Sequence, residues 1–491
     1  MKHVLAIDEG TTGVTCLVVS ERGEIVGRGY SEITQHFPKP GWVEHDAAEI
    51  FDRTVATARS AIESAGVMPD AIGITNQRET IVVWDRETGE PLHRAIVWQD
   101  RRTAERCREL APHAPMITRR TGLPVDPYFS GTKLELLLSL PHVAKLVAEK
   151  RVLAGTMDTW LIWKLTGGEV HATDPTNASR TLLFDIRARA WSDELCGLLS
   201  VDKSVLPEVR KSSGDFGNTR SELLGASIPI RGVAGDQQAA LFGQACVNAG
   251  EGKNTYGTGA FLLLNTGAVQ PEPGEGILTT VACDANGDYA YALEGAIFIA
   301  GAAVQWLRDG LGIIEKAPET ENLARSLDSN DGVYFVPALT GLGAPHWNPD
   351  ARGTIVGLTR GTTRAHLARA ALEAMAYGTA DVLSAMRERS GVAFDRLRVD
   401  GGASANDWMM QFQADIIGVP VERPEIVDTT AMGAAGLAGI ASGVWKTSSE
   451  FHSVRRFATF KPSMAEANRR SLVAGWNRAI DTALYWADGK R

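Results

Sequence analysis

Short apolar runs that end in turns rich in Gly and Thr recur along the chain and predict strands. The first run, residues 4–7, leads into the turn DEGTTG at residues 8–13, and a second apolar run follows at residues 14–19. Further strands are predicted at residues 71–75, 81–84, 96–98, 228–234, 260–264 and 397–400.

Segments with helical periodicity separate these strands. A capping pattern at residues 46–49 predicts a helix that ends at Gly66, and apolar spacing predicts a long helix over residues 363–389. Shorter helices are predicted at residues 160–165, 237–244 and 407–413, a docked helix in the tail after residue 451, and tightly packed Gly/Ala-rich helices at residues 295–307 and 431–444. Strands that alternate with helices indicate an α/β fold.

The opening pattern returns near residue 245. Residues 253–264 again contain a turn, here GTG, that leads into an apolar strand. We therefore expect two similar domains that face each other across a cleft, the first over residues 1–245 and the second over residues 246–491.

Composition narrows the function. The 491 residues carry a net charge of −9, which argues against general binding of nucleic acid or anionic membranes, and no apolar stretch reaches the ~20 residues of a membrane span. The five Cys residues form no Cys-x-x-Cys pair, and the N-terminus becomes acidic too early for a signal peptide. These features indicate a cytoplasmic protein with reduced thiols.

Several motifs of common enzyme classes are absent. The sequence has no P-loop, no Gly-x-Gly-x-x-Gly after a strand, no His-Glu-x-x-His and no Gly-x-Ser-x-Gly. The lone His residues show no metal-ligand spacing and are interpreted as structural.

Two acidic residues follow predicted strands. The turn at residues 8–13 offers backbone N–H groups and Thr hydroxyls to phosphate oxygens, and Asp8 could hold Mg²⁺, although a plain hairpin turn is as good an interpretation. Asp236 could accept a hydroxyl proton during phosphoryl transfer. Taken alone, its position before residues 237–244 slightly favours a helix N-cap.

Other candidates have a functional and a structural interpretation. Arg78 and Glu79 could bind a polyol, but a solvated loop with a surface ion pair is the commoner case. Tyr128 could offer a hydroxyl, and Trp98 and Phe261 could wall a carbon chain, although core packing is more usual for each. Residues 400–406, a Gly turn after a strand, suit a close approach to a nucleotide or a simple turn before a helix.

The order of these motifs resembles the FGGY carbohydrate kinases, and within them the glycerol kinases, over nearly the whole chain. The most specific stretches are residues 38–45, 74–80, 126–133, 158–164, 173–180, 235–244 and 254–259. The resemblance implies two domains of the ribonuclease-H/actin-like ATPase fold with ATP, Mg²⁺ and substrate in the cleft. It also implies transfer of the γ-phosphoryl group to glycerol, giving sn-glycerol 3-phosphate, by a homo-oligomer (dimer or tetramer).

The resemblance assigns roles to individual residues. Asp236 would be the general base and Asp8 would serve Mg²⁺. The glycerol site would consist of Arg78, Glu79, Trp98, Tyr128, Asp236, Gln237 and Phe261. The nucleotide site would consist of Thr11, Thr12, Gly13, Thr15, Thr258, Gly301, Gln305, Gly402 and Asn406.

Four positions depart from the family pattern, and one of them is Leu136, which replaces a Trp that is common in the family helix after Lys133. Glu9 stands where many members have Gln and could place another anion near the phosphates, and Thr15 stands where relatives often have Arg. Relatives that are inhibited by fructose 1,6-bisphosphate have Arg at the position of Ser227. We therefore do not expect this inhibition here.

Two other functions fit the same motifs. One is a kinase for another polyol or sugar, which a substrate panel with xylulose, ribulose, gluconate and erythritol would identify. The other is an actin-like ATP switch, whose ATP turnover would not depend on any small alcohol.

Overall fold

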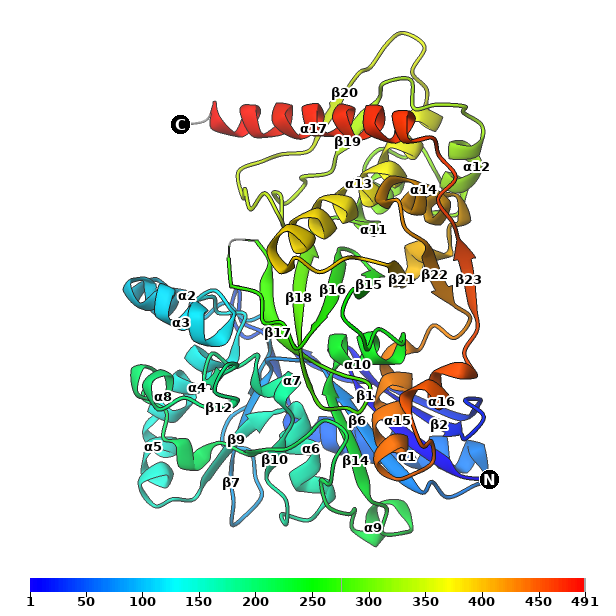
Figure 1. Ribbon diagram of the computed structural model, residues 1–491. Coiled ribbons are helices and arrows are strands. Elements are labelled where there is room, and N and C mark those ends of the chain that lie inside the picture. The colour runs from blue at the N-terminus through cyan, green and yellow to red at the C-terminus, as the bar shows by residue number, and fades with distance from the viewer. Residues whose placement is uncertain (275, 490–491) are drawn as a thin grey trace. The chain divides into compact units, whose positions relative to one another are not determined.

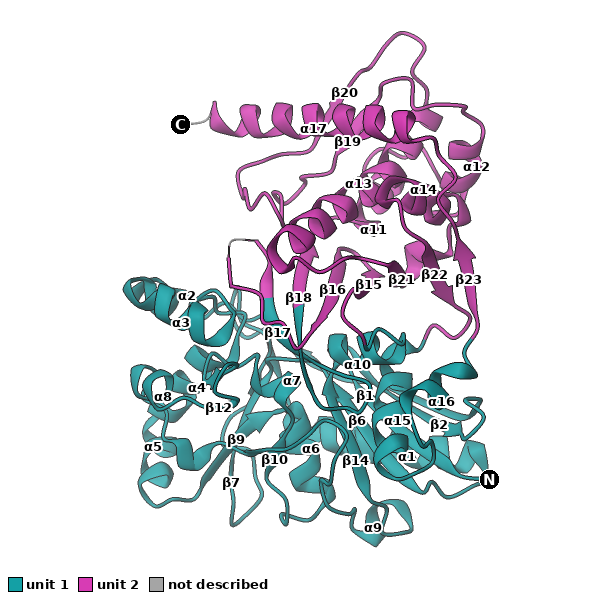
Figure 2. Cartoon of the chain, in the orientation of Figure 1, with its two compact units in different colours: residues 1–247, 279–292, 428–455 teal, residues 248–278, 293–427, 456–491 magenta. Residues whose placement is uncertain are grey.

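The computed structural model describes residues 1–274 and 276–489, which form two compact units (Figures 1 and 2). Unit 1 comprises residues 1–247, 279–292 and 428–455, and unit 2 comprises residues 248–278, 293–427 and 456–491. The chain first crosses from unit 1 to unit 2 after residue 247, two residues beyond the predicted domain boundary at residue 245. Two later segments return to unit 1, so neither unit is continuous in sequence.

Unit 1 is built on a five-stranded sheet with the order β14-β6-β1-β2-β3. β1, β2 and β3 are antiparallel neighbours, whereas β6 runs parallel to both β1 and β14. A second sheet has the order β4-β5-β8-β7-β9. The strands of unit 1 are β1 His3–Glu9, β2 Gly13–Ser20, β3 Ile25–Glu32, β4 Gln35–His36, β5 Glu44–His45, β6 Ala71–Asn76, β7 Ile81–Asp85, β8 Ala95–Ile96, β9 Val152–Thr156, β10 Ala172–Thr173, β11 Phe184–Asp185, β12 Ala190–Trp191, β13 Glu208–Val209 and β14 Ile230–Gly235.

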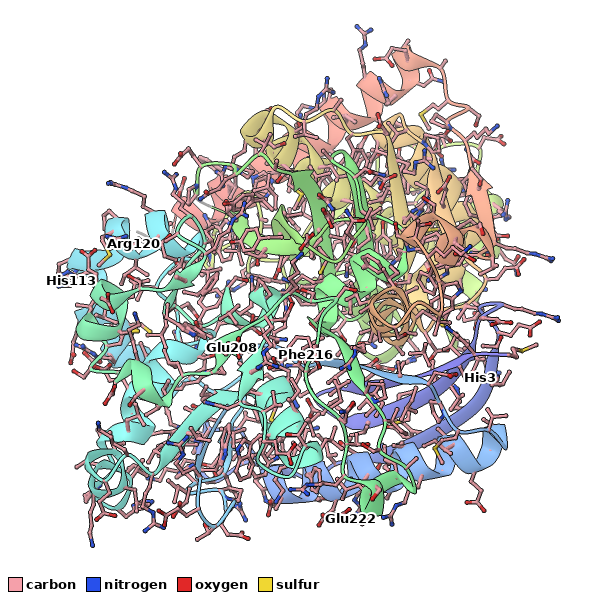
Figure 3. All side chains as sticks on the ribbon, turned by 60° about the horizontal axis from the view of Figure 1, so that its bottom comes forward. His3, His113, Arg120, Glu208, Phe216 and Glu222 are labelled. Atoms are coloured by element: carbon pink, nitrogen blue, oxygen red, sulfur yellow. The ribbon has the colours of Figure 1, made fainter. Side chains whose placement is uncertain are left out.

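The helices of unit 1 cover these sheets. They are α1 Ala47–Ala65, α2 Ala104–Glu109, α3 Ala114–Thr121, α4 Ser130–Ser139, α5 Pro141–Ala148, α6 Met157–Leu165, α7 Pro175–Ala178, α8 Asp193–Leu198, α9 Ser221–Leu224, α10 Asp236–Gly243, α15 Thr429–Ala441 and α16 Ser448–Ser453. α1 matches the predicted helix, since Asp46 accepts hydrogen bonds from the backbone N–H groups of Ala48 and Glu49 and Gly66 ends the helix in a left-handed conformation. Figure 3 shows Phe216, which is fully buried, among the interior side chains, and His113 and Glu222 on the periphery.

α15 explains the Gly/Ala-rich stretch predicted at residues 431–444. It packs against α10, β6 and β14 (Figure 1). A Cβ atom added to Gly73 on β6 would lie 2.1 Å from the carbonyl oxygen of Ala434, and one on Gly433 would lie 1.8 Å from that of Ala239 on α10. Gly is therefore required at residue 73, where β6 meets α15, and at residue 433, where α15 meets α10.

Unit 2 repeats the strand arrangement of unit 1. A sheet has the order β17-β18-β16-β15-β21-β22-β23, in which β15 and β16 form an antiparallel hairpin and β15, β21 and β22 run parallel. The order β22-β21-β15-β16-β18 corresponds to β14-β6-β1-β2-β3. The predicted similarity of the two halves is thus confirmed at the level of strand order.

The elements after residue 250 are as follows. The strands are β15 Glu251–Tyr256, β16 Ala260–Gly267, β17 Leu278–Cys283, β18 Tyr289–Ile297, β19 Tyr334–Val336, β20 Thr354–Val356, β21 Arg396–Asp400, β22 Val421–Pro424 and β23 Phe457–Phe460, and β17 and β18 carry residues of both units. The helices of unit 2 are α11 Gly301–Asp309, α12 Glu319–Arg325, α13 Arg364–Ser390, α14 Asp407–Ile417 and α17 Glu466–Asp488. The predicted tail helix is α17, which packs on β19 and β20.

The helix predicted over residues 295–307 begins later than expected. Residues 295–297 complete strand β18, and α11 begins only at Gly301. Composition alone misled here, because small apolar residues suit a buried strand end as well as a packed helix.

The chain has no paired cysteine among the described residues, and all five cysteines are buried. Over residues 1–274 and 276–489, no helix combines the length and the apolar character that crossing a bilayer requires.

Candidate active site

The carboxyl ends of the parallel strands in unit 1 bring two predicted acidic residues to one edge of the sheet. Asp8 lies opposite Thr75 near the ends of β1 and β6, and Gly235 at the end of β14 pairs with Asn76, so that Asp236 follows at the same edge. Ligands of open α/β sheets bind at this edge.

Asp8 lies in an acidic environment. Burial, together with repulsion from the carboxylates of Asp236 and Asp428, raises the pKa of Asp8 to about 7. A cation beside Asp8 would relieve this repulsion.

The site therefore fits Mg²⁺ in its usual form. Mg²⁺ is commonly held by one or two carboxylates and by substrate phosphates. No cluster of three or more His, Cys, Asp or Glu residues suited to a metal occurs in the described part of the chain. Asp8 is the residue that would hold the ion.

Asp236 is the first residue of α10 and not its N-cap, so the interpretation slightly favoured from sequence is wrong. The N-cap is Gly235, which is extended. The Asp236 Oδ1 atom accepts a hydrogen bond of 2.6 Å from the backbone N–H of Gln237 and lies 3.1 Å from the Nε atom of Arg78. With 33% of its side chain exposed, Asp236 can still reach a ligand.

Arg78 and Glu79 are buried, so the solvated-loop interpretation is wrong as well. Their side chains are 3% and 1% exposed, and the Arg78 Nε atom lies 3.9 Å from the Glu79 Oε1 atom. Arg180 donates from Nε to the same Glu79 oxygen over 2.6 Å. Buried charges are tolerated only when they are paired in this way.

Two aromatic residues of the predicted glycerol site contact each other. The rings of Trp98 and Tyr128 meet edge to face with centroids 5.5 Å apart, and both residues are half-buried. Lys133 on α4 is fully buried and donates from Nζ to the carbonyl oxygens of Val97, Trp98 and Tyr128. Lys133 thereby fixes the backbone of both aromatic residues.

The turn after β1 joins this group. The indole N–H of Trp98 donates to the Thr11 hydroxyl over 2.9 Å, whereas Thr12 is exposed. Gly13 must lack a side chain, because an added Cβ would lie 2.7 Å from the carbonyl oxygen of Ser31. Thr15 pairs with Asp8 across the β1–β2 hairpin.

Glu9 is directed into the interior. Its side chain is fully buried, its Oε1 atom accepts a hydrogen bond of 2.7 Å from Gln77, and burial raises its pKa well above the usual range. A raised pKa favours the neutral carboxyl group, so Glu9 adds little negative charge at the turn.

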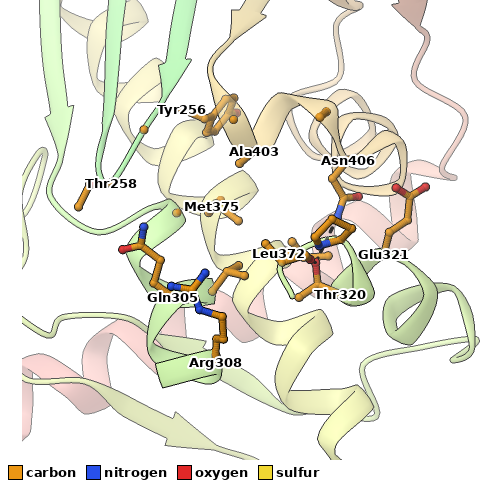
Figure 4. A pocket seen from close by; sticks show the side chains of 17 residues that line it. Tyr256, Thr258, Gln305, Arg308, Thr320, Glu321, Leu372, Met375, Ala403 and Asn406 are labelled. Atoms are coloured by element: carbon orange, nitrogen blue, oxygen red, sulfur yellow. Dashed lines mark hydrogen bonds between the residues drawn. The ribbon is translucent and has the colours of Figure 1, made fainter. Parts of the chain in front are cut away.

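Unit 2 contains a cavity of about 490 Å³ that gathers all five predicted nucleotide residues of this unit (Figure 4). These residues are Thr258, Gly301, Gln305, Gly402 and Asn406. Other residues that line it, which the sequence did not single out, include Tyr256, Arg308, Thr320, Leu372 and Met375. A volume of this size suits a small-molecule cofactor.

Local backbone contacts shape the cavity. The turn after β15 accepts hydrogen bonds from the start of α11, since the N–H of Gly301 donates to Gly257 O and the N–H of Ala302 to Thr258 O, each over 3.0 Å. On the opposite wall, Asn406 caps α14 by accepting from the N–H of Met409 and donates to the Thr320 hydroxyl over 3.4 Å (Figure 4).

Two predicted site residues remain, one in each unit. Phe261 is half-buried on β16 of unit 2, and Gln237 follows Asp236 on α10 of unit 1. Arg180, Lys133 and Gln238 also belong to the site of unit 1 but were not predicted as site residues. A signal existed, because all three lie within the stretches that resemble known kinases, but residue type alone gave them no role.

Comparison with known proteins defines the class and then the family. In overall structure, the chain is similar to Plasmodium falciparum glycerol kinase with ADP, with a TM-score of 0.94, 37% identity and coverage of 99% of this chain and 98% of that one. The chain is a kinase with the actin-like ATPase fold. Models of the N- and C-terminal domains of the FGGY family of carbohydrate kinases match residues 3–243 and 252–442. The chain belongs to the FGGY family of carbohydrate kinases.

Two relatives that match over nearly the full length are glycerol kinases. The chain is 54% identical to a glycerol kinase of Dechloromonas aromatica and 55% identical to one of Deinococcus radiodurans, in each case over 99% of this chain and 98% of the relative.

Proposed function

We propose that this protein transfers the γ-phosphoryl group of ATP to glycerol, giving sn-glycerol 3-phosphate and ADP. The observation that carries the proposal is identity above 50% to glycerol kinases over nearly the whole chain. The site adds physical support, since it combines a partly exposed carboxylate, a buried Arg–Glu pair and two half-buried aromatic rings.

Glycerol would bind to unit 1. Arg78 and Glu79 present a donor and an acceptor suited to hydroxyl groups, with Gln237 and the Tyr128 hydroxyl as further partners. The Trp98 ring, with Phe261 of unit 2, would contact the carbon chain.

Asp236 would act as the general base. It would take the proton of the attacking hydroxyl as the oxygen bonds to the γ-phosphorus and the bond to ADP breaks. Arg78, 3.1 Å from Asp236, holds the carboxylate in place. Mg²⁺ at Asp8 would neutralise charge on the phosphates when bound.

The nucleotide would occupy the cavity of unit 2. Thr258, Gly301, Gln305, Gly402 and Asn406 line that cavity. Thr11, Thr12 and Gly13 on the turn after β1 would contact the triphosphate, with Thr15 nearby. The division of roles is thus substrate and phosphates in residues 1–245 and nucleotide in residues 246–491. Action in the cytoplasm and assembly into a homo-oligomer remain predictions.

A coupled assay of ADP release tests the function. The purified chain with Mg²⁺ and ATP should release ADP when glycerol is added and little in its absence. Xylulose, ribulose, gluconate and erythritol serve as comparison substrates. ADP release that ignores glycerol, or a clear preference for one of the other compounds, would refute the proposal.

A further inference from the structure

A closed ring of polar contacts lies behind the Arg78–Glu79 pair. Arg180 donates to Glu79 over 2.6 Å, the Glu79 carboxylate lies 3.9 Å from Arg78, and Arg78 donates from Nη1 to the Gln238 Oε1 atom over 3.3 Å. Gln238 and Arg180 then both donate to the hydroxyl oxygen of Thr280, over 3.5 and 3.4 Å. Five side chains therefore hold one another in a loop.

The ring joins segments that are distant in sequence but all belong to unit 1. Arg78 and Glu79 lie between β6 and β7, Arg180 follows α7, Gln238 is on α10 and Thr280 is on β17. Arg180 and Glu79 are 101 residues apart. No single helix or strand orients the Arg78–Glu79 pair, so the ring supplies the orientation.

The backbone of Glu79 is also held by a contact from another segment. Its φ of 63° is in the left-handed region, which is unfavourable for a residue with a side chain. The Ser130 hydroxyl donates to the Glu79 carbonyl oxygen over 2.9 Å. Backbone and carboxylate are thus each held by a partner from another segment, the arrangement by which strained residues persist at functional sites.

Arg180 is the member of the ring that contacts both Glu79 and Thr280. Its side chain is 0% exposed, so it acts through its neighbours. Its guanidinium group contacts Glu79 and Thr280, and also lies over the rings of Phe129 and Tyr128, with distances to the ring centroids of 5.2 and 5.9 Å. One side chain thereby supports both a charged and an aromatic member of the proposed glycerol site.

We propose that Arg180, supported by Gln238 and Thr280, is a positioning residue that sets the affinity for the polyol by fixing the carboxylate of Glu79. This inference rests on the proposed function, because it takes Glu79 to bind a hydroxyl group of glycerol. Arg is required at this place, since a Lys ammonium group cannot reproduce the planar set of donors that reaches Glu79 and Thr280 together.

The first test is the variant Arg180→Lys in the full chain. We expect its KM for glycerol to rise about 10–100-fold, the range that a lost hydrogen bond to a charged group gives, with kcat and the KM for ATP within about threefold of wild type. An unchanged KM for glycerol in a folded, active variant would overturn the inference.

A double-mutant cycle tests whether Arg180 acts through Glu79. The double variant Arg180→Lys with Glu79→Gln should be no worse in KM for glycerol than Glu79→Gln alone, because the positioned group is already lost. If the two substitutions instead raise the KM for glycerol by the product of their separate effects, Arg180 does not act through Glu79.

A matched control separates positioning from loss of stability. Arg369 on α13 of unit 2 is also buried and pairs with Glu373 over 2.7 Å. Arg369→Lys should lower the melting temperature and leave the KM for glycerol unchanged. A similar rise of this KM in both Arg variants would refute a specific role for Arg180.

Thr280→Val provides a second route if Arg180→Lys does not fold. This change keeps the shape and removes the shared hydroxyl, and should raise the KM for glycerol about 3–10-fold, since the lost bonds have a neutral acceptor. An unchanged KM would contradict the inference. The outcomes remain distinct from failure of the proposed function, because that failure would appear in the wild-type protein as ADP release independent of glycerol.

Discussion

Exposure separates the charged residues of unit 1 into those that can meet a substrate directly and those that support them. Asp236 is one-third exposed, whereas the side chain of Arg78, which pairs with it, is almost fully buried and that of Arg180 is fully buried. The same ion pair that orients the Asp236 carboxylate leaves part of it accessible. Because Asp236 is the most exposed of these charged side chains, we expect proton transfer there.

Replacing Asp236 with Asn should lower kcat for glycerol phosphorylation by about 10²–10⁴-fold, the usual contribution of a positioned base. The amide keeps the shape of the side chain but cannot accept the proton, so the fold should survive with a similar melting temperature. Steady-state kinetics and thermal unfolding measure the two effects.

Asp215→Asn is the matched control, because Asp215 pairs with Arg231 in the same unit but is 72% exposed. Its kcat should equal that of wild type. If Asp236→Asn retains full kcat, Asp236 is not the base.

At the scale of elements, a buried carboxylate joins α6 to β10. Asp158 in the first turn of α6 accepts hydrogen bonds from the hydroxyl groups of Thr156 and Thr173, over 2.5 and 2.6 Å. Burial, and next the nearby charge of Asp174, raise the pKa of Asp158 to about 7. The folded protein therefore binds a proton at Asp158 that the unfolded chain releases near pH 4.

This pKa predicts how stability changes with pH. A raised carboxyl pKa contributes stability that is fully present below the unfolded value of 3.8 and is lost as the pH rises through about 7. The variant Asp158→Asn does not titrate, so the stability of wild type relative to this variant should fall between pH 5 and pH 8, by roughly 1–4 kcal/mol. Melting temperatures of both proteins across this range measure the difference.

Asp52, an exposed residue of α1, supplies the comparison. The variant Asp52→Asn should show a constant offset from wild type over the same pH range. A constant offset for Asp158→Asn would mean that Asp158 is already ionised in the folded protein.

Elements with strong local signals were predictable from the sequence, and contacts across the chain were not. α1 and α13 have caps that can be recognised from a few adjacent residues, at Asp46 and Thr363. Residues 295–307 lack such signals, and their strand-to-helix change was missed. The burial of Arg78 and Glu79 depends on Arg180, 101 residues after Glu79, and no local pattern reports such a partner.

At the scale of the whole molecule, the repeated strand order gives each unit a turn at the same position, between the first two strands of the unit. The β1–β2 turn carries Thr11 and Thr12, and the β15–β16 turn carries Thr258. The sequence showed this repeat as two similar turns, and the cavity in unit 2 gathers five of the nine residues that the family resemblance assigns to the nucleotide. Because this cavity lies in unit 2 and most of the proposed glycerol residues lie in unit 1, affinities for ATP and for glycerol should be separable by mutation.

Asn406→Ser tests this separation. Ser can still cap α14 but is too short to reach the Thr320 hydroxyl on the cavity wall, so the fold should be retained. We expect the KM for ATP to rise about 3–10-fold, as for one lost neutral hydrogen bond, with the KM for glycerol unchanged. Equal changes in both constants would contradict separate sites.

The late position of α15 in the chain has a consequence for biosynthesis. Unit 1 begins at the first residue, yet the helix that packs against β6, β14 and α10 is encoded by residues 429–441. During translation, part of the apolar surface of the amino-terminal segment stays uncovered until residues 429–441 have left the ribosome, and a gene fragment that stops at residue 247 should yield an aggregation-prone product.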